Sequence, residues 1–273
     1  MSLGHCRTRG IALVAVLWVV SLLAVIAASF ATTVRSETVV ARNQIQNAEA
    51  RALADAGFYR TVMALALDRE GMSISGLPEA WSFSGGKVTT SVQAESGKVD
   101  LNAADAALLA GLFAAAGAID PGALAAAVVD FRDADSDPQP RGAEDPDYRA
   151  AGLTFGAKNR PFERKDELLQ VLGMTRAVYD AVAPAVTVYS RSKSIDPEIA
   201  SDEVLEALQA VGLVEPNGAR DSSSLGANAV PIFTIRAKAE TEGGAVFVRE
   251  AIVALTRGGR QPFRILTWEQ GKL

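Results

Sequence analysis

Apolar residues form one uninterrupted stretch near the start of the chain, from Ile11 to Ala31, in which Ser21 and Ser29 are the only polar side chains. An α-helix rises about 1.5 Å per residue, so this stretch would be about 30 Å long, which is the hydrocarbon thickness of a bilayer. It is longer than the apolar core of about 7–15 residues in a secretory signal peptide. The pattern therefore predicts a transmembrane helix.

The charges on either side of this stretch predict its orientation. Arg7 and Arg9 stand just before it, whereas Arg35 on the far side is soon offset by Glu37. By the positive-inside rule, the short N-terminus stays in the cytoplasm and the remaining residues are exported. A cleaved secretory signal is the alternative, because residues 29–31 resemble a poor signal-peptidase site.

Helical spacing continues beyond the apolar stretch, and no proline occurs before Pro78. The spaced positions are Val34, Ile45, Ala48, Ala52, Ala56, Tyr59, Val62, Met63, Ala66 and Leu67. We therefore expect one helix from near residue 11 to about residue 69, with an amphipathic exported half. Gly57 is its weak point, at a cost of about 1 kcal/mol relative to alanine. Gly71, Gly76 and Pro78 are expected to end it.

From Trp81 the hydrophobic period changes to two, which is typical of β-strands. The alternation predicts a hairpin over residues 81–93 with its turn at Gly85-Gly86. The same pattern returns near the C-terminus in three predicted strands, Pro231–Ala239, Ala245–Thr256 and Phe263–Trp268. We expect one antiparallel sheet packed against the long helix, which is an α+β fold. The long interruption of this sheet predicts an inserted domain.

Two stretches within the interruption, 99–112 and 195–208, align without a gap and share identical residues at Asp100/Asp196, Ala104/Ala200, Leu109/Leu205 and Leu112/Leu208. Each is expected to be a capped entry into a helix. Between them, residues 166–174 predict a helix that ends at Gly173, and residues 175–182 predict a second helix. These units resemble sterile-alpha-motif-like (SAM-like) and helix-hairpin-helix modules. We therefore expect a large all-α insert of two such bundles.

The insert carries a loop rich in acidic side chains. Seven carboxylates lie within eighteen residues, at Asp130, Asp133, Asp135, Asp137, Glu144, Asp145 and Asp147. Such a density is costly unless a cation neutralises it, and an oxygen-lined site suits Ca²⁺. We take Asp133, Asp135, Asp137, Glu144 and Asp145 as the candidate ligands. The alternative is a solvated surface loop without a metal.

The spacing within this loop partly resembles that of an EF-hand. When Asp133 is counted as the first position, Asp135, Asp137 and Glu144 are the third, fifth and twelfth. Pro138, however, occupies the sixth position, where an EF-hand needs glycine, and no clear helix is predicted after Glu144. An EF-hand is therefore not expected, although its carboxylate spacing is present.

The junction before the apolar stretch resembles a prepilin leader, in which a prepilin peptidase cuts after a glycine that follows a basic segment. Here Arg9-Gly10 stands directly before Ile11, so cleavage would free Ile11, which is expected to be methylated. Most pilins and pseudopilins carry glutamate at the fifth mature position, where this chain has Ala15. A buried carboxylate needs a partner in the bilayer, so a subunit without one can occupy the end of a filament.

Composition excludes several kinds of chemistry for the processed chain. The single histidine and the single cysteine, His5 and Cys6, would leave with the leader. Disulfides, thiol nucleophiles, imidazole bases and His/Cys zinc sites would then be absent. Loss of Arg7 and Arg9 would leave 25 basic against 32 acidic residues, a net charge of −7. That balance argues against binding to nucleic acid.

The order of several motifs resembles the family of type II secretion minor pseudopilin K, also called general secretion pathway protein K. These motifs are the junction at Gly10, the missing glutamate at Ala15, KVDLNAA at 98–104, FRDADSDP at 131–138, GAED at 142–145, NRPFERKDEL at 159–168 and GMT at 173–175. The resemblance implies a pseudopilin fold with a large inserted helical domain. It also implies an inner-membrane subunit with a periplasmic head, which binds minor pseudopilins I and J at the filament tip and holds calcium.

The expected domains follow from these patterns. They are a prepilin leader at 1–10, a transmembrane helix at 11–31, an amphipathic helix with the first strands at 32–98, a first SAM-like domain with the acidic loop at 99–194, a second helical repeat and linker at 195–228, and the closing strands at 229–273.

Three functions are weighed against one another. The favoured one is an assembly subunit that initiates or caps a pseudopilus for export across the outer membrane. A membrane-anchored DNA receptor of the competence type is the alternative, because some helix-hairpin-helix modules bind DNA phosphates. A metal-dependent hydrolase is the third, but without histidine or cysteine its base would have to be a carboxylate, lysine or tyrosine. We therefore expect no enzymatic activity.

Overall fold

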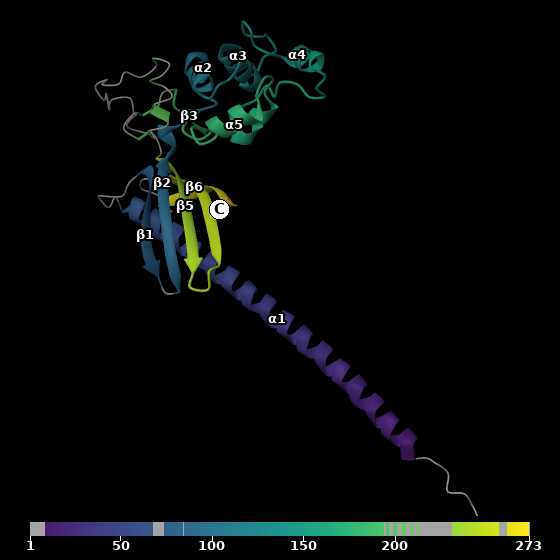
Figure 1. The fold of residues 1–273 in the computed structure, drawn as a ribbon. Helices are drawn as coiled ribbons and strands as arrows, with labels where there is room; N and C mark the ends of the chain where they lie inside the picture. Colours follow the sequence, from purple (N-terminus) through teal and green to yellow (C-terminus); the bar gives the residue numbers. More distant parts are fainter. Residues whose placement is uncertain are drawn as a thin grey trace, which may run out of the picture.

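The structure, a computed structural model, describes residues 9–67, 74–83, 85–193, 195–196, 199–200, 204–205, 209, 212, 231–256 and 261–272. It shows an α+β chain with three parts (Figure 1). A long helix projects from one end of a five-stranded sheet, and a group of short helices lies beyond the opposite end of that sheet.

Helix α1 (Arg9–Ala66) is continuous over 58 residues. The expected single helix is confirmed, and it begins slightly earlier and ends slightly earlier than predicted. Packing on the sheet begins only at Ala50, which is fully buried, and continues through Leu53, Ala54, Phe58 and Val62. The C-terminal half of α1 is therefore amphipathic, because these residues repeat at helical spacing on one face.

Gly57 marks the closest approach of α1 to the sheet. A Cβ atom at this position would lie 2.7 Å from Val88 Cγ1 and 3.4 Å from Ala237 Cβ. The absence of a side chain therefore lets the helix and the sheet come together, which compensates for the low helix propensity of glycine. The sequence pattern had indicated only that glycine at this position destabilises the helix.

Five antiparallel strands form the sheet, in the spatial order β1-β2-β5-β6-β7. They are β1 (Ser75–Phe83), β2 (Gly86–Ala94), β5 (Ile232–Thr241), β6 (Val246–Leu255) and β7 (Phe263–Gln270). The predicted hairpin and all three predicted C-terminal strands are present. Alternate residues of β5 are buried, as their period of two predicts, and β5 pairs directly with β2 across the insertion.

Pro78 does not end α1, as the sequence suggested. The helix stops at Ala66, and Pro78 lies within β1, next to an irregularity in the register between β1 and β2. Strand β1 is at the edge of the sheet, where proline can replace a residue because its missing N–H faces away from the ladder.

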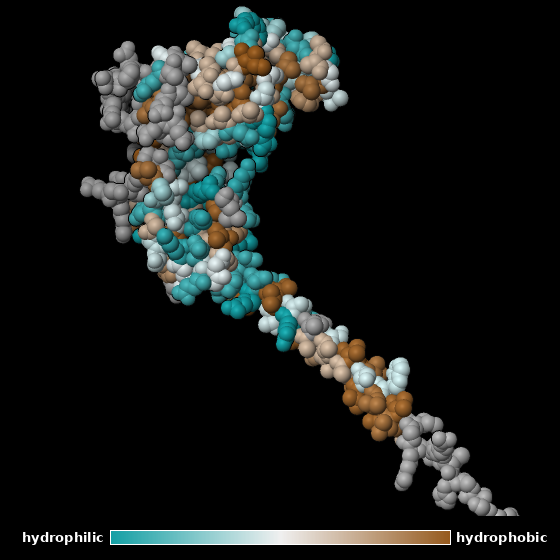
Figure 2. All heavy atoms as spheres, viewed as in Figure 1, coloured by the Kyte–Doolittle hydropathy of each residue, from teal (hydrophilic) through white to brown (hydrophobic). Residues whose placement is uncertain are grey.

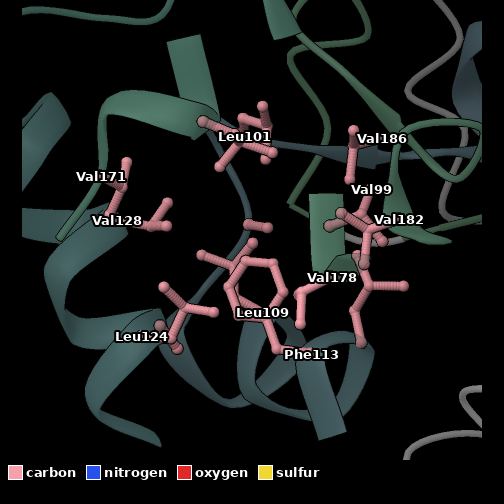
Figure 3. Close-up of a cluster of buried hydrophobic side chains, with 14 of the residues drawn as sticks. Val99, Leu101, Leu109, Phe113, Leu124, Val128, Val171, Val178, Val182 and Val186 are labelled. Atoms are coloured by element: carbon pink, nitrogen blue, oxygen red, sulfur yellow. The ribbon is translucent and has the colours of Figure 1, made fainter. Parts of the chain in front are cut away.

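The insert between β2 and β5 has its own hydrophobic core (Figure 3). Its helices are α2 (Ala106–Ala115), α3 (Pro121–Arg132), α4 (Asp145–Ala150) and α5 (Arg176–Val182), with a 3₁₀ helix, η2 (Lys165–Gln170). Leu109, Phe113, Leu124, Val128, Val178 and Val182 come together from α2, α3 and α5 in this core. This core is thus distinct from the one between α1 and the sheet.

One local expectation for the insert is confirmed and one is wrong. The stretch 99–112 does contain a capped entry into a helix, because Asp105 caps α2 by accepting a hydrogen bond from Leu108 N, whereas Asp100 ends the short strand β3 (Val99–Asp100). The predicted helix at 166–174 is the 3₁₀ helix η2, which stops before Gly173. Gly173 has φ +87°, so the chain does turn through a left-handed residue there.

Of the second expected bundle, at 195–208, the structure describes residues 195–196, 199–200 and 204–205, and Ala200 and Val204 are buried in the core of the insert. The linker at 215–228 lies outside the described residues. The two ends of the first bundle meet in a parallel pair, β3 with β4 (Val186–Thr187). Entry to and exit from this bundle are therefore adjacent.

A buried carboxylate lies where the insert joins the sheet, in the 3₁₀ turn η1 (Glu95–Gly97). Glu95 Oε1 accepts hydrogen bonds from Lys98 Nζ and Thr234 Oγ1, each at 2.6 Å, and Oε2 accepts one from Thr187 Oγ1. Thr187 belongs to the insert and Thr234 to the sheet. Arg164 of the insert and Glu269 of β7 add an exposed ion pair at 3.8 Å. The buried Glu95 carboxylate and this ion pair thus connect the insert to the sheet.

Candidate metal centre

The acidic loop connects α3 to α4 and is anchored by a helix at each end. Asp133 is the C-cap residue of α3, and Glu144 is the N-cap residue of α4. The expectation that no helix follows Glu144 is wrong: α4 begins at the next residue, and Asp147 Oδ2 accepts a hydrogen bond from Glu144 N at 3.0 Å. An acidic residue in the first turn suits the positive end of a helix.

Asp130 folds this loop back on itself. Its carboxylate is fully buried and accepts hydrogen bonds from Gln139 N at 3.0 Å and Ala143 N at 2.7 Å. Gly142 permits this arrangement, because a Cβ atom there would lie only 1.9 Å from Asp130 Oδ2. As a result, Glu144 returns to the end of α3 and lies beside Asp133.

Asp133, Asp135 and Glu144 form a compact group, in which one carboxylate oxygen from each lies within 4.8 Å of the others. Glu144 is 2% exposed, and neither of its carboxylate oxygens has a hydrogen-bond partner. Asp133 Oδ1 is likewise buried without a partner. Each orphaned charged oxygen would cost at least about 1–3 kcal/mol, so the group needs a positive partner.

The electrostatic environment agrees with this geometry. Burial raises the pKa of the Glu144 carboxyl above its usual value, and the nearby charges of Asp130 and Asp133 raise the pKa further. Burial also raises the pKa of Asp133, with a further contribution from Asp135. The adjacent Arg132 does not supply a hydrogen bond, since its guanidinium donates to the main-chain carbonyls of Leu101 and Ala104.

The other two candidate ligands lie outside this group of three. Asp137 is exposed, and its main-chain N donates to Asp135 Oδ1 at 3.0 Å, which orients the Asp135 carboxylate. Asp145 Oδ2 pairs with Arg149 at 3.1 Å on the first turns of α4. The arrangement offers hard oxygen ligands from three carboxylates, which fits a divalent cation such as Ca²⁺.

Residues 89–191, which include the whole acidic loop, match the family model described as Type II secretion system (T2SS), protein K. The resemblance to the protein K family is confirmed. The matched segment runs from the second strand of the sheet to the end of the first helical bundle, so it contains both the junction at Glu95 and the candidate metal ligands.

The protein K likeness extends to a solved structure. A chain of the crystal structure of the GspK-GspI-GspJ complex from the enterotoxigenic Escherichia coli type 2 secretion system matches with a TM-score of 0.59. The match covers 88% of this chain and 99% of that chain, at 19% sequence identity. It confirms the predicted fold, a long N-terminal helix with an antiparallel sheet. No curated protein matches the sequence.

The predicted processing residues, Gly10 and Ile11, lie in the first turn of α1. Within the described part of the chain, α1 is the one helix whose length and composition would allow it to cross a membrane. Its apolar half has no contact with the head and appears as a brown rod in Figure 2, with Trp18 75% exposed. Toward the head the same helix becomes hydrophilic.

Sequence reasoning missed one polar residue at the acidic loop. Asn159 follows α4 by nine residues, outside the carboxylate run, yet its Oδ1 atom is buried and lacks a partner. The sequence signal was its place at the start of the NRPF motif, which the protein K resemblance included without a role.

Proposed function

We propose that this chain is the minor pseudopilin K of a type II secretion system. It lies at the tip of the pseudopilus, where it initiates or caps assembly with minor pseudopilins I and J for protein export across the outer membrane. The observation that carries the proposal is the helical domain inserted between β2 and β5, within the segment that matches protein K. Its function depends on surfaces rather than on a reaction, so we expect no enzymatic activity.

The position of the insert supports a place at the filament end. It lies beyond the end of the sheet that is remote from the free half of α1 (Figure 1). If α1 packs along the filament axis with neighbouring helices, the insert projects past the head. A further subunit stacked there would collide with it, so the filament would end at this subunit.

Co-purification tests the proposal. The full-length chain, processed in membranes together with I and J, should be isolated in detergent as a complex with both, present only at filament ends. A matched variant has residues 99–187 replaced by a short turn, and it should lose the restriction to the ends. Failure of the full chain to associate with I and J, or its uniform distribution along pseudopili, would contradict the proposal.

The membrane topology belongs to the same proposal. Prepilin peptidase would cut between Gly10 and Ile11, and α1 would remain in the inner membrane with its N-terminus cytoplasmic and the head periplasmic. The charge pattern around the apolar stretch supports this orientation. Sequencing of the mature N-terminus should give a methylated Ile11, whereas a start near Thr32 would contradict this processing.

Calcium is proposed as the resident cation of the acidic loop. Asp133, Asp135 and Glu144 would hold it, with Asp137 and Asp145 at the edge of the site. The ion would supply positive charge to the oxygens of Asp133 and Glu144 that no protein donor reaches, and it would connect the end of α3 to the start of α4. Titration of the full chain with Ca²⁺ should show binding and a higher melting temperature, and neither effect in the wild type would refute the site.

A further inference from the structure

Buried oxygen atoms without a hydrogen-bond partner occur in the acidic loop and on Asn159, which contacts that loop. Among the described residues, six buried side-chain atoms lack a hydrogen-bond partner. Two are nitrogens in the head, Trp81 Nε1 and Arg249 Nη2. The other four are all oxygens, and they belong to Asp133, Glu144 and Asn159. Acceptors that collect without any donor are typical of a cation site, because a cation satisfies several lone pairs at once.

Asn159 is held beside the acidic loop by contacts at both ends of the residue. Its main-chain N donates to the carbonyl of Phe131 at 3.0 Å, at the end of α3. Its side-chain Nδ2 donates to Ser136 Oγ at 3.3 Å, between two acidic positions of the loop. The amide nitrogen is thus engaged with the loop, whereas Oδ1 of the same amide is buried and free.

The backbone of Asn159 also indicates a fixed orientation. Its φ is +49°, in the left-handed region that asparagine tolerates better than most residues with a side chain. The neighbouring residues are fastened: Lys158 Nζ donates to Glu167 at 2.8 Å, and Phe162 stacks on Phe131 with ring centroids 5.1 Å apart. Contacts of the surrounding residues therefore fix the position of the amide.

We propose that Asn159 Oδ1 is a further ligand of the cation in the acidic loop, beside Asp133, Asp135 and Glu144. This inference rests on the calcium site in the proposed function. A neutral amide oxygen is a normal Ca²⁺ ligand, and it adds coordination without adding a fourth negative charge. The ligand comes from the segment after α4, so the ion joins that segment to the loop between α3 and α4.

Three variants of the full chain in detergent test this role, with Ca²⁺ alone as the probe. Asn159→Gly removes the amide without straining the left-handed backbone, and it should raise the Ca²⁺ dissociation constant at least tenfold. Asn159→Asp keeps an oxygen ligand and should bind within about threefold of the wild type. Ser136→Ala removes only the partner of Nδ2 and should also stay within about threefold. Isothermal titration measures all three.

The outcomes separate this inference from the calcium site itself. If the wild type binds no Ca²⁺, the site in the proposed function fails, and this inference fails with it. If the wild type binds and Asn159→Gly binds equally well, Asn159 is not a ligand and the three-carboxylate site stands. If Asn159 had only a structural role, Ca²⁺ binding would be weakened in Asn159→Asp and Ser136→Ala as much as in Asn159→Gly. Rescue by aspartate alone, with melting temperatures in EDTA matched among the variants, supports ligation.

Discussion

Glu95 connects the insert to the sheet, and its removal should weaken the whole chain. Glu95 is 1% exposed and pairs with Lys98, which is itself 7% exposed. In Glu95→Ala, the Lys98 ammonium would remain buried without a counter-charge, and the hydroxyls of Thr187 and Thr234 would lose their acceptor. Removal of one partner from a buried ion pair costs about 3–5 kcal/mol. We expect a loss of unfolding free energy of that size.

Matched substitutions distinguish charge from shape at this junction. Glu95→Gln keeps the volume but removes the charge, and it should cost less, about 1–3 kcal/mol. Adding Lys98→Met to Glu95→Gln removes the stranded charge and should recover part of that loss, because an uncharged pair of similar volume can be nearly neutral.

Urea unfolding of the full chain in detergent, followed by tryptophan fluorescence, measures these differences. Spin labels placed on α3 and β6 would report whether the insert also becomes mobile relative to the sheet. A Glu95→Ala chain within 1 kcal/mol of the wild type, with an unchanged distance distribution, would show that the carboxylate contributes nothing to this connection, and the reasoning would be refuted.

Three further predictions concern the head and the loop. Gly57→Ala should cost about 1–3 kcal/mol, because its Cβ would lie 2.7 Å from Val88 Cγ1; an unchanged urea midpoint would contradict such close packing. Phe58→Ala should cost about 3–5 kcal/mol, measured in the same way, since the ring is fully buried and packs edge-on against Trp268 at 4.8 Å. Burial raises the pKa of the carboxyls of Asp133 and Glu144 in the folded chain, so without calcium the folded state binds more protons than the unfolded state, and these groups lower stability as pH rises above the usual carboxyl range. The rise in melting temperature caused by Ca²⁺ should therefore be larger at pH 7 than at pH 5, and an equal rise at both would contradict this linkage.

The architecture of the head could be predicted from its sequence because its hydrophobic periods are long and regular. The uninterrupted helical spacing before Pro78 gave one helix, and alternation in residues 231–239 gave a strand whose buried residues are those expected. Pro78 itself was misplaced, since an edge strand accepts proline as readily as a helix end does. Such an edge position depends on which strands pair, and no local pattern contains that information.

Short elements of the insert were less predictable, because contacts distant in sequence decide them. Residues 165–170 have good helix formers, yet they form a 3₁₀ turn. There the Glu167 carboxylate accepts hydrogen bonds from Lys158 Nζ and from the main-chain N of Glu163 and Arg164, which fixes the start of the turn. These contacts come from the preceding loop, whose path the local sequence does not specify.

The candidate metal site, too, could be predicted only in part from the sequence. The spacing of Asp133, Asp135 and Glu144 placed them on one loop, and the structure brings them together. That spacing did not reveal that Asp145 pairs with Arg149 or that Asn159 returns to the loop. Coordination by residues from separate segments is set by the packed core beneath them, which a linear pattern does not describe.

The way the insert is attached has a consequence for how such a subunit can change over evolution. Ala94 at the end of β2 is paired with Phe233 at the start of β5, so the pairing of these two strands is complete at this end of the sheet without the helices. The two ends of the insert's first bundle meet at Val99 and Val186. The insert can therefore be lengthened, shortened or replaced during evolution while every residue pair between β2 and β5 is preserved. Inserted modules of different size and specificity can then share the same sheet and the same long helix.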